Sequence, residues 1–190
     1  FGENWSLLGT TESCCPNGDE PKTEELPDGS VIISSRTKGR WFNIFRFDDK
    51  TYTSGHWENP VIAKDIICQQ NACNGEIMGL LAIDTQTNKE VWLYLQSVPY
   101  GPKRTHVSIY YKPLPLLVDC KTITPENFGE GWERFEITPD GSAYSTFCMT
   151  ADKQIAFLYE RANIAGQWLY DICFEKLSIE QITHGRYTIK

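Results

Sequence analysis

Short stretches in which apolar and polar residues alternate recur along this chain, and helical periodicity is poor throughout. Strict alternation is typical of a strand with one buried face, because successive side chains of a strand point to opposite faces of the sheet. The alternation predicts strands at residues 30–35, 40–47, 90–98, 105–112, 154–160 and 170–177. We therefore expect an all-β protein.

Turn-forming residues separate the predicted strands. They occur at Asp28-Gly29, Gly101-Pro102, Asp140-Gly141 and around Ala165-Gly166. We also predict a hairpin tip at residues 86–89, one short helical turn at 177–182 and a long polar loop over one face at 119–139. A sandwich, a barrel or a set of propeller blades would all show this spacing. Blades of about 40–50 residues would divide the chain into roughly four.

The bulk composition narrows the class of protein. The chain has 190 residues, of which 41% are hydrophobic and 23% charged, as is typical of one globular domain. Its net charge of −7 argues against a nucleic-acid partner, since such proteins are usually basic. No apolar run approaches the roughly 20 residues of a membrane span. An anionic ligand would need positive charge concentrated at its binding site. Two clusters of basic residues offer it: Arg36, Lys38 and Arg40, and Lys103 and Arg104. The alternative is that these clusters are solvated basic loops.

The seven cysteines leave at least one thiol unpaired within the chain. Cys68 and Cys73 are close enough in sequence for a small disulfide loop, and separate buried thiols are an equal alternative. Because the chain has no C-x-x-C pair and only three histidines, we expect no zinc site, and no cofactor is predicted. The chain begins at Phe1 rather than at a methionine, and we therefore expect that a segment precedes it.

The stretch from residue 19 to residue 36 carries the first candidate site residues. It reads D-E-P-K-T-E-E-L-P-D-G-S-V-I-I-S-S-R, with Glu20 at the head of a loop and Arg36 at the end of a strand. Three further candidates are Arg104 in P-Y-G-P-K-R, Tyr144 in S-A-Y-S-T-F and Glu160 at the end of Q-I-A-F-L-Y-E. Arginine presents a planar fork that matches a carboxylate and stays charged. A tyrosine nucleophile needs a base within hydrogen-bond reach.

Taken in order, these pieces make residues 19–183 resemble bacterial exo-α-sialidases (neuraminidases) of the Bacteroides type. The stretches R-W-F-N-I-F, C-N-G-E-I and L-S-I-E-Q-I-T add to the resemblance. The resemblance implies a six-bladed β-propeller, of which residues 1–190 would be about the C-terminal half of the catalytic domain. It also implies an enzyme that hydrolyses terminal α-linked sialic acids of glycoconjugates with retention, and a secreted or periplasmic location.

The resemblance also assigns a role to each candidate residue. Tyr144 would be the nucleophile, as sialidases are an exception to the usual carboxylate pair of glycosidases, and Glu20 would be its base. Arg36 and Arg104 would be two members of a three-arginine clamp on the substrate carboxylate. Glu160 would position the first arginine of that clamp. That arginine, from an R-I-P-type motif, and the acid/base aspartate after it are not in this chain, so the N-terminal portion of the same domain is an expected partner.

Two distances follow from these roles. The guanidinium groups of Arg36 and Arg104 should lie within about 6–8 Å of each other, close enough to share one carboxylate. The Tyr144 hydroxyl should lie roughly 2.6–3.2 Å from a carboxylate oxygen of Glu20.

Other polar residues in these segments are interpreted as structural. Arg46 does not match the first-arginine motif, and Asp48 and Asp49 are read as turn residues. Two non-enzymatic alternatives remain: a carbohydrate-binding propeller that grips sialic acid without turnover, and a structural β-repeat module with no sugar site. Residues that fall in family-like segments, and for which we favour a structural role over substrate contact, are Asn74, Glu76, Gln96 and Tyr100.

Overall fold

The structure, a computed structural model, describes residues 5–63, 72–117, 119–162 and 169–190. It is all-β, with antiparallel strand pairs throughout the two sheets that these residues form. The first sheet has the order β1-β2-β3-β4, with β5 also paired to β3. Its strands are β1 (Asp19–Glu25), β2 (Val31–Thr37), β3 (Gly39–Phe47), β4 (Gly55–Trp57) and β5 (Val61–Ile62).

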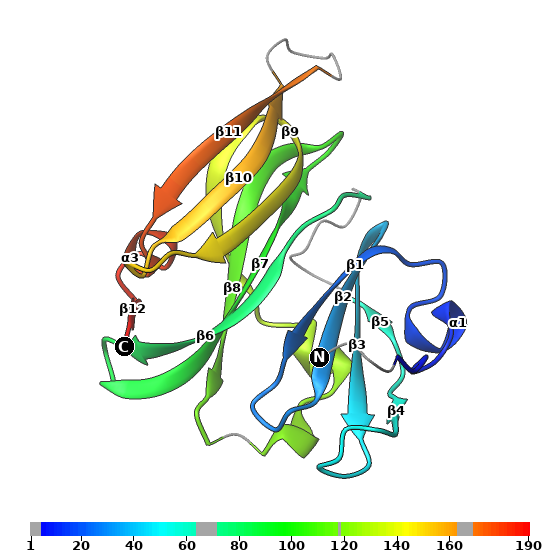
Figure 1. Ribbon diagram of the computed structural model, residues 1–190. Coiled ribbons are helices and arrows are strands. Elements are labelled where there is room, and N and C mark those ends of the chain that lie inside the picture. Colours follow the sequence, from blue (N-terminus) through cyan, green and yellow to red (C-terminus); the bar gives the residue numbers. More distant parts are fainter. Residues whose placement is uncertain (1–4, 64–71, 118, 163–168) are drawn as a thin grey trace.

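The second sheet has the order β11-β10-β9-β8-β7-β6-β12. Figure 1 shows the first sheet, in blue to cyan, beside the second, in green to red, and β1 contacts β6. The strands of the second sheet are β6 (Ile77–Asp84), β7 (Lys89–Gly101), β8 (Thr105–Pro115), β9 (Glu133–Met149), β10 (Ile155–Ala162), β11 (Tyr170–Leu177) and β12 (Tyr187–Ile189). Short helices are α1 (Thr11–Cys14), the 3-10 helix η1 (Cys120–Thr122), α2 (Pro125–Phe128) and α3 (Ile179–Ile182).

One apolar core joins the two sheets. Phe42 of β3 stacks on Trp132 with ring centroids 6.0 Å apart, and Phe128 of α2 meets both rings edge-on. The indole N–H of Trp132 donates to the carbonyl oxygen of Phe128 at 2.7 Å, so its buried polar atom is satisfied. Tyr94 of β7 completes this cluster, and its ring packs edge-on against Phe128. The shared core fixes the first sheet against the second.

All six predicted strands are confirmed, and they correspond to β2, β3, β7, β8, β10 and β11. The turns predicted at Asp28-Gly29 and Gly101-Pro102, the hairpin tip before β7 and the helical turn at α3 are also confirmed. The predicted turn around Ala165-Gly166 lies outside the described residues. β6 was not predicted, because apolar residues fill most of I-M-G-L-L-A-I-D and do not alternate with polar ones.

Two predictions about local structure are wrong. The stretch 119–139 is not one polar loop, because it contains η1 and α2 and enters β9 at Glu133. Asp140-Gly141 is not a turn between strands, since both residues lie within β9. Gly141 pairs with Thr105 of β8, and the register shifts between Thr105 and Val107 absorb the irregularity. Long-range pairing here overrides the local turn preference.

No helix among residues 5–63, 72–117, 119–162 and 169–190 is long and apolar enough to cross a membrane.

Candidate active site

Three of the predicted site residues meet directly through their side chains. The Tyr144 hydroxyl donates to Glu20 Oε1 at 2.6 Å, within the expected range. Arg36 Nη1 donates to Glu20 Oε2 at 2.8 Å and to the Tyr144 hydroxyl oxygen at 2.9 Å. The three side chains come from β9, β1 and β2, so this cluster joins the two sheets. The side chains of Arg36 and Glu20 keep 20% and 28% of their surface exposed, which leaves the cluster accessible to a ligand.

A local irregularity of β1 directs Glu20 toward this cluster. Asp19 pairs with Arg36, but the register shifts before Lys22 pairs with Ser34. Glu20 lies in the shifted part with a φ of 44°, a region that non-glycine residues rarely occupy. It was expected at the head of a loop; the structure instead places it inside β1, at this bulge. Bulges of this kind re-aim side chains next to functional sites.

Arg104 lies at the turn between β7 and β8, beside the same tyrosine. Its guanidinium carbon is 5.7 Å from the centroid of the Tyr144 ring, and that of Arg36 is 6.0 Å from the same centroid. Arg104 Nη2 donates to the carbonyl oxygen of Ala72 at 3.0 Å, and its own carbonyl accepts from the N–H of Ser142 at 2.7 Å. Both arginines therefore lie beside Tyr144, while the 6–8 Å separation between their guanidinium groups stays a prediction.

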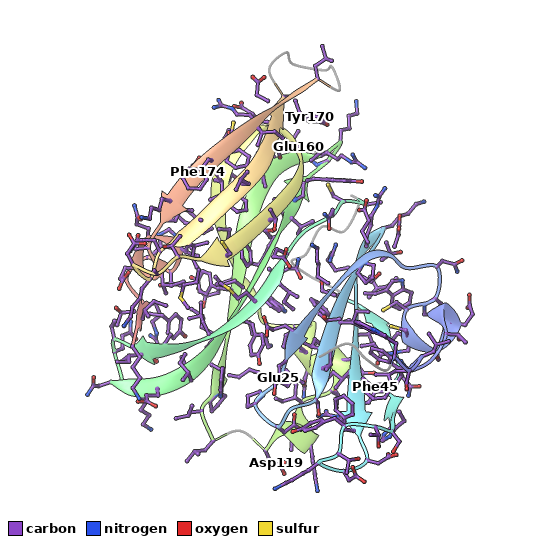
Figure 2. The ribbon with its side chains drawn as sticks, in the orientation of Figure 1. Glu25, Phe45, Asp119, Glu160, Tyr170 and Phe174 are labelled. Carbon is purple, nitrogen blue, oxygen red and sulfur yellow. The ribbon has the colours of Figure 1, made fainter. Side chains whose placement is uncertain are left out.

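Glu160 lies on β10 next to this cluster, but its contact differs from the expected one. Its Oε2 accepts a hydrogen bond from the backbone N–H of Tyr144 at 2.9 Å. The arginine that it was expected to position is one that the resemblance places outside these 190 residues, so that role stays a prediction. Figure 2 labels Glu160 and Tyr170 near the same end of β10 and β11.

The contacts of Glu20 and Tyr144 push their pKa values apart. Burial alone would raise the pKa of Glu20, but hydrogen bonds from Tyr144 and Arg36 and the charges of Arg36 and Arg104 outweigh it and lower that pKa. The hydrogen bond to Glu20 and burial raise the pKa of Tyr144, against the opposing charge of Arg36. At neutral pH the pair is therefore a carboxylate and a neutral phenol, as a base and its proton donor must be.

The lowered pKa of Glu20 affects the stability of the fold. The folded state binds this proton less tightly than the unfolded state does, so Glu20 contributes stability above the ordinary glutamate pKa of about 4.3. That contribution is lost as the pH falls through the lowered folded-state pKa. We expect Glu20→Gln to remove this part of the acid dependence. Urea unfolding of the full-length protein and the variant, between about pH 6 and pH 3, measures it; parallel curves would contradict the expectation.

Several residues near the site contact it in ways that sequence reasoning missed. Arg104 interacts with Tyr170 of β11, and burial raises the pKa of that tyrosine while Arg104 opposes the rise. The carbonyl of Ala72 is a backbone group, so no residue type could have indicated it. Asp19 Oδ2 lies 3.9 Å from Arg36 Nη1, beside the Glu20 carboxylate. The position of Asp19 directly before Glu20 in the sequence was the one signal that could have indicated this contact.

The other polar residues of the family-like segments bond to protein groups. Gln96 is buried and accepts from the Ser34 hydroxyl at 2.6 Å. Glu76 pairs with Lys22 at 3.2 Å and accepts from Thr146 at 2.8 Å.

Tyr100 and Asn74 also contact protein groups. The Tyr100 ring lies 4.2 Å from the guanidinium carbon of Arg134, and Asn74 Oδ1 accepts from the N–H of Gly75 at 2.9 Å. Arg46 pairs with Asp28 and Glu58. In the described part of the chain no three His, Cys, Asp or Glu side chains gather closely enough to hold a metal ion. Cys73 is buried with a free thiol, and Cys68, its suggested disulfide partner, lies outside the described residues.

Comparison with known proteins gives the class of fold. No protein-family model matches the chain, and no curated protein does. Solved structures do match. The intramolecular trans-sialidase of Ruminococcus gnavus has a TM-score of 0.64 at 17% identity over 95% of this chain. The leech intramolecular trans-sialidase has a TM-score of 0.64 at 20% identity over 96% of this chain. NanB sialidase of Streptococcus pneumoniae has a TM-score of 0.58 at 15% identity over 86% of this chain.

These similarities show a sialidase-like fold, because the identities are too low to carry more than the fold. The chain spans only part of each matched protein: 37% of the Ruminococcus gnavus chain, 27% of the leech chain and 24% of the NanB chain.

Proposed function

We propose that this chain is about the C-terminal half of the catalytic domain of a retaining exo-α-sialidase of the Bacteroides type, a secreted or periplasmic enzyme with a six-bladed propeller. Its substrates are glycans with terminal α-linked sialic acids. The observation that carries this proposal is the 2.6 Å hydrogen bond from Tyr144 to Glu20 beside two arginines. A phenol, a carboxylate base and guanidinium groups are the set that such a reaction requires.

The two arginines bind the carboxylate of the substrate. Sialic acid carries a carboxylate on its anomeric carbon, and a guanidinium group binds a carboxylate through parallel charge-assisted hydrogen bonds. Arg36 uses one nitrogen for Glu20 and Tyr144, and an arginine has five N–H donors, so it can hold the substrate without releasing the base. The carboxylate of the sugar then places the anomeric carbon over Tyr144.

Tyr144 attacks that carbon while Glu20 takes the phenolic proton. A new bond forms between the Tyr144 oxygen and the anomeric carbon, and the glycosidic bond breaks; the departing oxygen receives a proton from the acid/base aspartate expected upstream of this chain. Water then hydrolyses the glycosyl-enzyme, so the configuration is retained. A neutral phenol suits this centre because an anionic nucleophile would be repelled by the sugar carboxylate.

A loss of ligand binding separates this proposal from a purely structural module. In the full-length protein, Arg104→Ala should weaken sialic-acid binding by about 10- to 100-fold, the usual range for a lost hydrogen bond to a charged group. Isothermal titration with free sialic acid measures it. Arg186→Ala is the matched control, since Arg186 pairs with Asp84 where β6 turns into β7, at the end of β7 away from Arg104.

Equal affinity in wild type and Arg104→Ala would contradict the arginine clamp. Binding without hydrolysis in the wild type would favour the carbohydrate-binding alternative instead.

The outer face of β10 and β11 supports the proposed N-terminal partner. Ile172 and Phe174 expose 68% and 60% of their surface, and Leu158 exposes 40%. Leu158 pairs with Phe174, and Ile172 pairs with Glu160, so these apolar side chains share a face with the site carboxylate. Figure 2 shows Phe174 and Glu160 on these two strands. Contiguous exposed apolar surface marks a contact site, and we assign it to the N-terminal portion of the same domain.

Covering this face would make Phe174 a buried residue in the full-length protein. Phe174→Lys should then lower the free energy of unfolding by about 1.5–3 kcal/mol, the value of burying one large apolar side chain. Chemical denaturation measures it, with Leu117→Lys as the control, because Leu117 is 95% exposed and lies outside this face. A change within about 0.5 kcal/mol, typical of surface positions, would contradict the assignment. So would hydrolysis of a sialoside by a monomer of these 190 residues alone.

A further inference from the structure

The strand that carries Tyr144 is irregular at that residue. β9 and β10 pair regularly from Ile155 opposite Met149 to Tyr159 opposite Ser145, and the next pair is Arg161 opposite Ser142. Between these pairs β10 contributes one residue, Glu160, whereas β9 contributes two, Ala143 and Tyr144. This two-against-one arrangement is a β-bulge, and a bulge takes backbone groups out of the regular ladder.

Glu160 takes the place of the missing ladder partner. Its Oε2 accepts the Tyr144 backbone N–H at 2.9 Å. The carboxylate is half-buried on the same face as the apolar residues of β11, and its charge also acts on Tyr170 and Cys73. The main chain of Tyr144 is thus held by a carboxylate side chain from the neighbouring strand.

We propose that Glu160 is a positioning residue for the nucleophile: by accepting the Tyr144 N–H at the bulge, it sets the direction in which the phenol leaves β9. This inference rests on the proposed function of Tyr144. The phenol reaches across from the second sheet to Glu20 on the first, with 2.6 Å between the oxygens. A small rotation of the bulge would therefore move the attacking oxygen away from its base, and misplacement by about 1 Å can cost on the order of 100-fold in rate.

This role differs from that of a charge partner for an arginine, and one substitution separates the two. Glutamine keeps an oxygen that can accept the N–H of Tyr144 but has no charge for a guanidinium group. Alanine keeps neither. A positioning role therefore predicts that Glu160→Gln behaves like wild type in the reaction of Tyr144, whereas a charge-partner role alone predicts that the two variants are equally impaired.

The test uses the full-length protein, Glu160→Gln and Glu160→Ala, with a fluorinated sialic-acid inactivator. We expect the limiting inactivation rate at saturating inactivator to fall by about 100-fold in Glu160→Ala and to stay within a few-fold of wild type in Glu160→Gln, which keeps the hydrogen-bond acceptor. Hydrogen exchange of the peptide around Tyr144, read by mass spectrometry, should be faster in Glu160→Ala and unchanged in Glu160→Gln.

Equal limiting rates in the two variants, with wild type labelled on Tyr144, would overturn the role of Glu160 alone. Unchanged exchange at Tyr144 in a folded Glu160→Ala protein would also overturn it. Wild-type labelling on another residue would overturn the proposed function itself. A reduced affinity for the inactivator in Glu160→Gln, with its limiting rate preserved, supports the positioning role, because affinity reports the clamp and the limiting rate reports the nucleophile.

Discussion

Replacing Tyr144 with phenylalanine in the full-length protein is expected to lower kcat for an aryl sialoside by at least about 1,000-fold, since loss of a nucleophile in other hydrolases costs up to about 10⁶-fold. The substitution removes one oxygen, the atom that lies 2.6 Å from Glu20 and 2.9 Å from Arg36. The ring and its contacts with the two arginines remain. Sialic-acid binding should therefore stay within a few-fold of wild type, because Arg36 and Arg104 supply the grip.

Steady-state hydrolysis and titration with free sialic acid, performed on the same preparation, measure both effects. Tyr111→Phe is a matched control, since it also removes a tyrosine hydroxyl bonded to a glutamate, here Glu133 at 2.7 Å, but away from the site. A Tyr144→Phe protein that keeps normal turnover would contradict the assignment of the nucleophile. A loss of sialic-acid binding in Tyr144→Phe as large as the loss of turnover would indicate that the hydroxyl binds the substrate instead.

Replacing Glu20 with alanine should lower kcat by about 100- to 10,000-fold, the usual contribution of a general base. Some turnover should remain, because the phenol can still lose its proton to water. The same change leaves Arg36 without its 2.8 Å partner, so binding also changes if the guanidinium group moves. Glu20→Gln preserves the shape and isolates the loss of the base, and Glu25→Gln is the control on the same strand, since Glu25 is exposed there.

The pH dependence of kcat/KM offers a second readout of this base, because that ratio reports the ionisation of groups in the free enzyme. Wild type should lose activity on the acid side as Glu20 becomes protonated, at a pH below the ordinary glutamate value because its pKa is lowered. Glu20→Gln should lack that acid limb. A variant with an unchanged acid limb would show that another group is the base.

Strands are predictable from the sequence where apolar residues alternate with polar ones, and poorly predictable where tertiary contacts decide. The alternation around Val31 and Ile33 correctly indicated β2, whereas β4 and β5 have only three and two residues and show no period. At Asp140-Gly141 a strong local turn signal was overridden by pairing with β8.

The candidate site was likewise predictable from the sequence only in part. The meeting of Tyr144 with Glu20 joins residues 124 positions apart, and no spacing rule predicts such a contact; only the resemblance brought the two together. The bulges that orient them were beyond sequence reasoning, because D-E-P reads as an ordinary turn and S-A-Y-S-T as an ordinary strand. The positive φ of Glu20 is held by contacts from β2 and β9 rather than by its own residue type.

The measurement that tests the central claim most directly is the site of covalent labelling in the full-length protein. A fluorinated sialic-acid inactivator that traps the glycosyl-enzyme should add one sugar to Tyr144, identified by mass spectrometry of the proteolysed protein, and Tyr144→Phe should remain unlabelled at that position. Labelling of the wild type on a different residue, or a Tyr144→Phe protein that keeps both labelling and turnover, would contradict the proposed mechanism.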